Sequence, residues 1–142
     1  MSGDDRKKVI FICTHNSARS QMAEGILKSL YGDRFEVYSA GTEPSRVNPY
    51  AIRAMEEIGI DISGHSSKAI EKFLGKEFDY VITLCGSADE TCPAFPGGGG
   101  NRLHRGFPDP SRFRGKDEEI LAGFRTVRDE IRTWLESEFE KN

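Results

Sequence analysis

Residues 9–24 read VIFICTHNSARSQMAE, and this stretch decides the fold. A continuous apolar run ends at Cys13, and Arg19 follows where a helical pattern begins. The run KVIFIC, residues 8–13, is short and rich in β-branched and aromatic residues, which predicts a central strand covered on both faces. From Ser20 onward, apolar residues recur at helical spacing and stop at a glycine, which is typical of a helix end. The stretch therefore predicts a strand, a tight loop and a helix N-terminus.

Apolar patterns of both periods alternate along the rest of the chain. FEVYSAG alternates and ends in glycine, FDYVITLCG is the strongest strand pattern after the first, and RLHRGF is expected as a short edge strand. An Asn-Pro pair is typical of a capped helix start. Strands are predicted at residues 35–41, 78–86 and 102–107, and helices from Asn48-Pro49 to Gly59, from a cap at Ser66 or Ser67 to residue 74, and over residues 117–139.

This alternation predicts an α/β fold, in which the strands form a parallel sheet with helices on both faces. We expect a single three-layer domain over residues 1–142, with a four-stranded parallel sheet flanked by helices and with residues 1–7 flexible. The glycine run Gly97–Gly100 follows a stretch rich in proline and lies outside these predicted elements. It either supplies loop mobility or is an insertion without a role.

The composition limits the classes of partner. The chain has 142 residues and a net charge of −3 without a dense basic block, which argues against a nucleic-acid partner. No apolar run approaches the ~20 residues that span a bilayer. The N-terminal MSGDDRKK lacks the apolar core of a secretory signal. We therefore expect a cytoplasmic monomer with no membrane partner.

The three cysteines, Cys13, Cys85 and Cys92, are not expected to form a structural disulfide framework, because their number is odd and the expected compartment is reducing. A single buried cysteine is otherwise a small core hydrophobe. Cys13 and Cys85 both end predicted strands, and ligands of parallel sheets bind outside the carboxyl ends of the strands. If the two strands are neighbours, both thiols face one crevice.

The loop CTHNSAR has the spacing C-x5-R between a strand and a helix. Its backbone N–H groups and the helix dipole form an anion-binding concavity, to which Arg19 adds a bidentate clamp for a tetrahedral oxyanion. The same field stabilises the thiolate of Cys13 as a nucleophile, and Ser20 can donate a hydrogen bond to it. The alternative is a core cysteine and a surface arginine. The predicted oxyanion-binding residues are Thr14, His15, Asn16, Ser17, Ala18, Arg19 and Ser20.

A nucleophile that attacks an oxyanion needs an acid for the leaving oxygen. Asp109 in GFPDPSR lies between two prolines, which restrict the backbone enough to hold a carboxylate over a site. The alternative is that the Asp-Pro pair only forms a turn. Beside the cysteine loop, the acid is favoured.

These motifs resemble a known family. C-x5-R-S after the first strand, with a late Asp-Pro loop, is similar to the low-molecular-weight protein tyrosine phosphatases. CTHNSARSQMAEG and VITLCGSADETCP resemble more closely one branch of that superfamily, the thioredoxin-coupled arsenate reductases. YSAGTEP, NPYAIRAMEEIGIDIS and VRDEI also fit, so that the resemblance covers about residues 8–138.

The resemblance implies the fold of these phosphatases and a reductase mechanism. Cys13 would attack arsenate and displace an oxygen that Asp109 protonates. Cys85 would release arsenite as a Cys13–Cys85 disulfide forms, and Cys92 would then move the disulfide to Cys85–Cys92. Thioredoxin or a similar dithiol would reduce it as an external reductant, with no tightly bound cofactor and no metal. Two thiols that become one disulfide supply the two electrons that arsenate reduction needs.

One departure from the family pattern concerns a monovalent cation. Lys68 stands where an acidic residue is expected in members that bind such a cation near Asn16, Glu24 and Ser39. We expect its ammonium group to replace the cation.

Three other functions remain as alternatives. A phosphatase would use Cys13, Arg19 and Asp109 but would not need the other two cysteines. A non-enzymatic thiol sensor or oxyanion-binding module would not need Asp109. Zinc ligation by Cys85, Cys92 and His104 lacks a fourth ligand, and C-x6-C is not a usual zinc-knuckle spacing.

Overall fold

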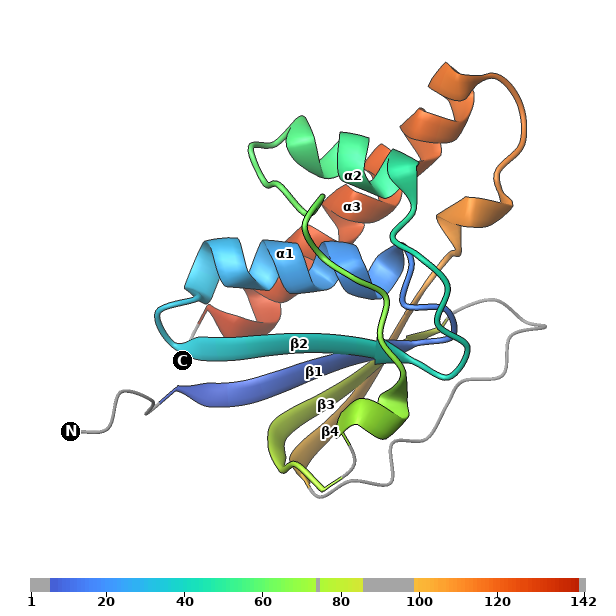
Figure 1. The fold of residues 1–142 in the computed structure, drawn as a ribbon. Coiled ribbons are helices and arrows are strands. Elements are labelled where there is room, and N and C mark those ends of the chain that lie inside the picture. Colours follow the sequence, from blue (N-terminus) through green and yellow to red (C-terminus); the bar gives the residue numbers. More distant parts are fainter. Residues whose placement is uncertain (1–5, 74, 86–98, 141–142) are drawn as a thin grey trace.

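The structure, a computed structural model, describes residues 6–73, 75–85 and 99–140. Figure 1 shows a twisted sheet with three α-helices stacked on one side of it. The elements, with η for short 3-10 helices, are β1 (Lys7–Cys13), α1 (Arg19–Tyr31), β2 (Phe35–Gly41), α2 (Pro49–Glu56), η1 (Ile70–Phe73), β3 (Phe78–Cys85), β4 (Gly99–Phe107), η2 (Pro110–Arg112) and α3 (Asp117–Phe139).

The sheet has four parallel strands in the order β2-β1-β3-β4, which confirms the predicted α/β class and the parallel sheet. From β1 the chain moves to one side of the sheet, and from β3 to the other. The strand order therefore reverses between β1 and β3, and the crevice at such a reversal is where ligands of open α/β sheets bind. Because β1 and β3 are hydrogen-bonded neighbours, their carboxyl ends meet at this crevice.

The two faces of the sheet are packed against different amounts of helix. Val9 and Phe11 of β1 belong to a large apolar cluster with side chains of α1, α2 and α3. Ile10 and Ile12 belong to a smaller cluster that includes η1. All three α-helices thus lie on one face in Figure 1, whereas among the described residues the other face is covered by η1. The third layer is thinner than the alternating pattern suggested.

Most predicted elements are present, and their ends follow local chemistry. Asn48 caps α2, because its side-chain oxygen accepts the backbone N–H of Tyr50, and Pro49 occupies the first helical position. Gly59 follows α2 with a φ of 81°, a conformation that glycine adopts without strain.

Three local expectations require correction. Lys7 is the first residue of β1, so the flexible stretch expected at residues 1–7 does not extend to it. Ser67 does not cap a helix; its hydroxyl accepts the N–H of Ser45 and donates to the carbonyl of His15. The edge strand β4 is longer than residues 102–107, because Gly99 pairs with Phe78 in the parallel ladder. The last two glycines of the run Gly97–Gly100 therefore belong to the sheet rather than to a mobile loop, while Leu74 and the first two glycines lie outside the described residues.

An ion-pair cluster fastens α2 to α3. Arg125 makes a bidentate contact with Glu57, from Nε to Oε1 at 2.8 Å and from Nη2 to Oε2 at 2.7 Å. Arg128 donates to the Ala54 carbonyl at 2.8 Å and to Glu57 at 3.2 Å. The hydrogen bond from Arg125 is the main cause that lowers the pKa of Glu57 from 4.5 to about 2. Within the described segments, no helix has the length and apolarity needed to cross a membrane.

The depressed pKa of Glu57 makes its contribution to stability depend on pH. Because the folded state holds this carboxylate ionised, the contribution is present above pH 4.5 and is lost as pH falls toward about 2. We expect Glu57→Gln to be less stable than the wild type at neutral pH and to converge with it in strong acid. Urea unfolding at a series of pH values measures this. Glu56→Gln, an exposed neighbour on α2, should show no such convergence, and a gap between Glu57→Gln and wild type that persists at pH 2 would contradict the assignment.

Candidate active site

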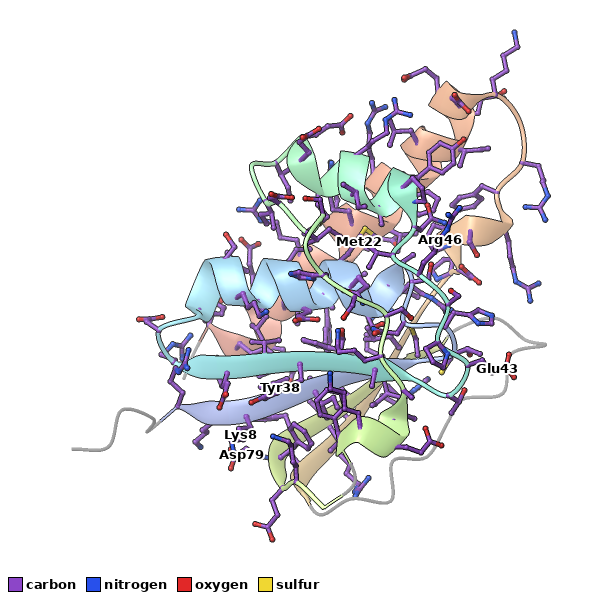
Figure 2. All side chains as sticks on the ribbon, viewed as in Figure 1. Lys8, Met22, Tyr38, Glu43, Arg46 and Asp79 are labelled. Carbon is purple, nitrogen blue, oxygen red and sulfur yellow. The ribbon has the colours of Figure 1, made fainter. Side chains whose placement is uncertain are left out.

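A pocket of about 320 Å³ opens at the carboxyl ends of the strands. Figure 2 shows Glu43 and Arg46 at this end, on the segment between β2 and α2, whereas Lys8 and Asp79 lie toward the opposite end of the sheet. The pocket is lined by the loop after β1, the segment after β2 and the segment after β4. The lining residues are Cys13, His15, Ser17, Ala18, Arg19, Ser45, Asp109 and Ser111.

The carbonyl groups of the loop between β1 and α1 are all bound by donors from the surrounding chain. Three donors are backbone N–H groups of the segment between β2 and α2, one is a backbone N–H of α1, and two are side chains. The contacts are Glu43 N to Thr14 O at 2.8 Å, Ser45 N at 3.3 Å and Ser67 Oγ at 2.8 Å to His15 O, Gln21 Nε2 to Asn16 O at 3.1 Å, Asn48 N to Ser17 O at 3.0 Å, and Met22 N to Ala18 O at 2.9 Å.

These contacts determine where the N–H groups of the loop point. A peptide unit is planar and trans, so its C=O and N–H groups point in opposite directions, and the described residues contain no cis peptide bond. Each carbonyl that is held by the surrounding chain therefore turns the next N–H away from its donor, and we infer that these N–H groups face the pocket. The loop folds this way partly because Asn16 adopts a φ of 49°, a left-handed conformation that asparagine tolerates better than most residues. The bound carbonyls agree with the concavity of N–H groups that the sequence predicts, and oxyanion binding by these residues stays a prediction.

Cys13 lies at the base of this concavity, with 2% of its surface exposed. Its sulfur is 2.9 Å from Ser20 Oγ. Asn16 Nδ2 donates to the same Ser20 oxygen at 2.8 Å, which leaves the hydroxyl proton of Ser20 for the sulfur. The geometry thus places a hydrogen-bond donor beside a thiol that is free of any disulfide.

Arg19 begins α1 and is buried, with its guanidinium at the pocket. Its Nη1 donates to the carbonyl of Phe107 at 3.2 Å, which ties α1 to the end of β4. Its Nη2 is 3.7 Å from Asp109 Oδ2. The other oxygen of Asp109 accepts the N–H of Ser111 at 3.0 Å and its hydroxyl at 2.7 Å. The predicted clamp and the predicted acid therefore face each other across the same pocket.

Of the other two predicted catalytic cysteines, the structure describes only Cys85. Cys85 is buried at the carboxyl end of β3 and is disulfide-bonded. It is not among the described residues that line the pocket. In the β3–β4 ladder it pairs with Phe107, beyond a register shift that follows Thr83. Cys92 lies outside the described residues.

The zinc alternative finds no support in the described part of the chain. His104 Nδ1 is paired with Thr83 Oγ1 at 2.8 Å. Among residues 6–73, 75–85 and 99–140, no group of three or more His, Cys, Asp and Glu side chains is arranged to hold a metal ion.

Comparison with known proteins places this site in a family. A profile described as "Low molecular weight phosphotyrosine protein phosphatase" matches residues 8–141. The chain belongs to this phosphatase family. Within the low-molecular-weight phosphatase family, the chain is 53% identical to an arsenate reductase of Halalkalibacterium halodurans over 127 residues, which are 89% of this chain and 91% of the relative.

Solved structures of the same family give a consistent picture. An arsenate reductase in its reduced state matches with a TM-score of 0.77 and 41% identity, over 95% of this chain and 98% of that one. A thioredoxin-dependent arsenate reductase of Corynebacterium glutamicum matches with a TM-score of 0.61 and 30% identity, over 95% of this chain and 63% of that one. The four-stranded parallel sheet and the loop after β1 are thus those of the low-molecular-weight phosphatase fold.

Some supporting residues were not found by sequence reasoning. Gly41 ends β2 against the loop, where a Cβ atom would lie 2.5 Å from Thr14 O and 2.8 Å from Asn16 N. The only signal for it was a strand pattern ending in glycine. Gln21 binds the Asn16 carbonyl from inside α1, and its signal was a polar residue next to the apolar stripe of a helix.

Behind the loop, the side chains expected around a monovalent cation surround Glu24. Ser39 Oγ donates to Glu24 Oε1 at 2.5 Å, and Lys28 Nζ donates to Oε2 at 2.9 Å. Lys68 Nζ lies 3.9 Å from Glu24 Oε1, and the backbone N–H of Lys68 binds the side chain of Asn16 at 2.8 Å. Burial lowers the pKa of Lys68, and Glu24 opposes that shift. The ammonium group of Lys68 thus lies near Glu24 and donates to the carbonyl of Ser66 at 2.6 Å, and its replacement of a cation stays a prediction.

We therefore expect turnover of arsenate, the substrate named in its relatives, to be largely independent of potassium. Steady-state rates in KCl and in NaCl of equal ionic strength measure this. Lys68→Met, which removes the positive charge beside Glu24, should introduce a response to the cation, whereas Lys72→Met on the exposed side of η1 should not. A strong potassium requirement in the wild type would overturn the assignment.

Proposed function

We propose that the protein is an arsenate reductase that converts arsenate to arsenite with the thiols of Cys13, Cys85 and Cys92. One observation carries the proposal: a free, buried thiol lies at the base of a concavity of inward N–H groups, opposite an arginine. The relatives named arsenate reductases, which match most of this chain, point to the same substrate.

In the first step, Cys13 attacks arsenic. The N–H groups of the loop, the N-terminus of α1 and Arg19 hold the oxygens of the arsenate dianion and orient it for attack. A sulfur–arsenic bond forms while one arsenic–oxygen bond breaks. Ser20 Oγ lies 2.9 Å from the attacking sulfur and holds it at the base of the pocket.

Asp109 protonates the oxygen that leaves. In the empty site, Arg19 and the Ser111 donors hold its carboxylate over the pocket. A bound dianion takes the place of Asp109 opposite Arg19, and Asp109 takes up a proton from the solvent in the open pocket. That proton passes to the leaving oxygen, which departs as water.

Cys85 then attacks the sulfur of Cys13. The electron pair of the sulfur–arsenic bond stays on arsenic, which leaves as arsenite while a Cys13–Cys85 disulfide forms. Cys92 attacks Cys85 and restores the Cys13 thiolate, so that two electrons have moved from two thiols to arsenic. The structure has Cys13 free and Cys85 disulfide-bonded, which is the distribution that this cycle reaches before re-reduction.

An external dithiol must complete the cycle, and thioredoxin is the proposed reductant because one relative is a thioredoxin-dependent arsenate reductase. The scheme needs no tightly bound cofactor. It needs a compartment in which thiols stay reduced, so we propose that the protein works as a monomer in the cytoplasm.

The experiment that tests this function is arsenate turnover with thioredoxin, thioredoxin reductase and NADPH. We expect sustained arsenite formation by the wild type and a single turnover at most by Cys92→Ser, because the disulfide of that variant cannot leave Cys13. Cys85→Ser should give no arsenite, and Asp109→Ala should lose about 10²-fold or more in rate, as removal of a general acid does. Hydrolysis of p-nitrophenyl phosphate by the same variants is the control.

The two rival functions give different results in these assays. A phosphatase would hydrolyse the phosphoester at full rate in both Cys→Ser variants while the wild type forms no arsenite. A protein that only binds oxyanions or senses oxidants would do neither reaction. Either outcome would replace the proposal.

The segment that carries Asp109 is fixed to α3 by one aromatic contact. Phe113 follows η2 and packs its ring directly on Gly123, where the Cβ of any other residue would overlap the ring. Near the start of α3, the Lys116 N–H donates to Glu119 at 2.9 Å. The contact between Phe113 and Gly123 therefore joins the segment that carries Asp109 to α3, in addition to the contacts of Asp109 with Arg19 and Ser111.

We expect Gly123→Ala to displace Phe113 and to reduce the kcat for arsenate by roughly tenfold, because misplacing a catalytic group by an ångström is costly. Its melting temperature should not fall in proportion, since alanine is favoured over glycine inside a helix by about 1 kcal/mol. Steady-state kinetics with thermal unfolding separate the two effects. Ala122→Ser, at the exposed neighbouring position, is the control, and an unchanged kcat in Gly123→Ala would refute this role of the contact.

A further inference from the structure

The peptide unit between Asn16 and Ser17 is held differently from the others in the loop. The carbonyls of Thr14, His15, Ser17 and Ala18 each accept at least one backbone N–H. The Asn16 carbonyl instead accepts the side chain of Gln21, at 3.1 Å. It is also the carbonyl of the residue with the left-handed φ of 49°. The orientation of this peptide unit therefore depends on one side chain.

The hydrogen-bond partners of Gln21 determine which end of its side-chain amide faces the Asn16 carbonyl. It is fully buried in the first turn of α1, and its Nε2 donates to both the Asn16 carbonyl and the Ser66 carbonyl, the latter at 2.9 Å. Both partners can only accept, so the amide nitrogen must lie on their side and Oε1 on the other. Oε1 is 3.0 Å from His65 Nδ1, which must then carry the proton.

The neighbouring residues His65 and Ser66 fix the orientation of the Gln21 amide. Burial lowers the pKa of His65, so its ring is neutral at pH 7, with a single N–H that Gln21 fixes at Nδ1. If the amide of Gln21 turned over, its oxygen would face the Asn16 and Ser66 carbonyls and two donors would be lost. His65 and Ser66 thus hold Gln21, and Gln21 holds the loop.

We propose that Gln21 is a positioning residue that locks the Asn16–Ser17 peptide in the orientation that turns the Ser17 N–H toward the oxyanion. Without it, the peptide unit can rotate, because the left-handed conformation of Asn16 is less favourable than its alternatives. Rotation turns the Ser17 N–H out of the pocket and the Asn16 carbonyl toward it. A carbonyl oxygen that faces a dianion repels it and weakens its binding.

The other contacts of Asn16 do not replace this lock. Its side chain is held by the N–H of Lys68 and by Ser20, and both contacts involve the amide beyond Cβ. They fix the side chain but not the carbonyl of the next peptide unit. Gln21 is therefore distinct from the groups that touch the substrate and acts through the backbone.

The test measures the binding of inorganic phosphate, a tetrahedral oxyanion, to the reduced protein by isothermal titration calorimetry. The inference rests on the oxyanion site of the proposed function but not on the relay, because phosphate binding needs neither Cys85, Cys92 nor thioredoxin. A failure of arsenate turnover would thus leave this test intact. The variants are Gln21→Met, which keeps the length of the side chain without its donors, and His65→Ala, which keeps Gln21 but frees its amide.

A core variant provides the matched control. Leu135→Ala removes a fully buried side chain of α3 that is not among the pocket residues, so it lowers the melting temperature without touching the loop. Comparison at equal loss of melting temperature separates a positioning role from a loss of stability. The ratio of the change in KM for arsenate to the change in kcat is a second readout, since lost ground-state binding raises KM.

We expect Gln21→Met to weaken phosphate binding by roughly tenfold or more, the effect of leaving one buried acceptor without its donor. His65→Ala should weaken it by less, and Leu135→Ala should leave it unchanged. The KM for arsenate of Gln21→Met should rise more than its kcat falls. If Gln21→Met does not fold, His65→Ala decides. Phosphate binding within about twofold of the wild type in the variants that fold would overturn the proposal.

Discussion

The site depends on one constraint: each outward carbonyl of the loop after β1 has a donor. A peptide unit cannot turn its C=O and N–H groups to the same side. The donors that bind the loop carbonyls therefore determine the direction of the N–H groups that would hold an anion. Those donors come from α1, from the chain between β2 and α2, and from Ser67. Arg19 and Cys13 then need only to lie at the two ends of a loop whose shape is already determined.

The parallel sheet brings these segments together. Because strand order reverses between β1 and β3, β2 lies on one side of this pair and β4 on the other, and a crevice forms at their carboxyl ends. β2 delivers the segment that carries the Glu43, Ser45 and Asn48 donors, and β4 delivers Asp109. Gly41 permits the close approach of β2 to the loop, since any side chain would meet the backbone there. The family resemblance thus has a physical basis in how the sheet presents the segments after β1, β2 and β4 to one pocket.

The sequence predicts the parts that depend on local patterns. α3 spans the predicted residues 117–139 because its apolar period is long and uninterrupted, and C-x5-R between a strand and a helix locates Cys13 and Arg19. The start of β4 was missed because glycine is depleted in strands, and pairing with β3 overrides that tendency at Gly99. The thin third layer was missed because alternation of elements does not say which face a helix covers. Gln21 was missed because its partners, His65 and Ser66, lie far away in sequence.

The proposed relay requires a disulfide between the ends of two neighbouring strands, β1 and β3. Adjacent strands lie about 4.8 Å apart, which falls within the ~4.4–6.8 Å between Cα atoms that a disulfide allows. Ile12 pairs with Thr83, so Cys13 and Cys85 end their strands almost in register. The β3–β4 register shifts between Thr83 and Cys85, so the ladder is interrupted just before Cys85. The loop around Cys13 has every carbonyl bound and is held in place by the surrounding chain. The adjustment that brings the two sulfur atoms together in the proposed relay therefore falls to the end of β3 rather than to the loop.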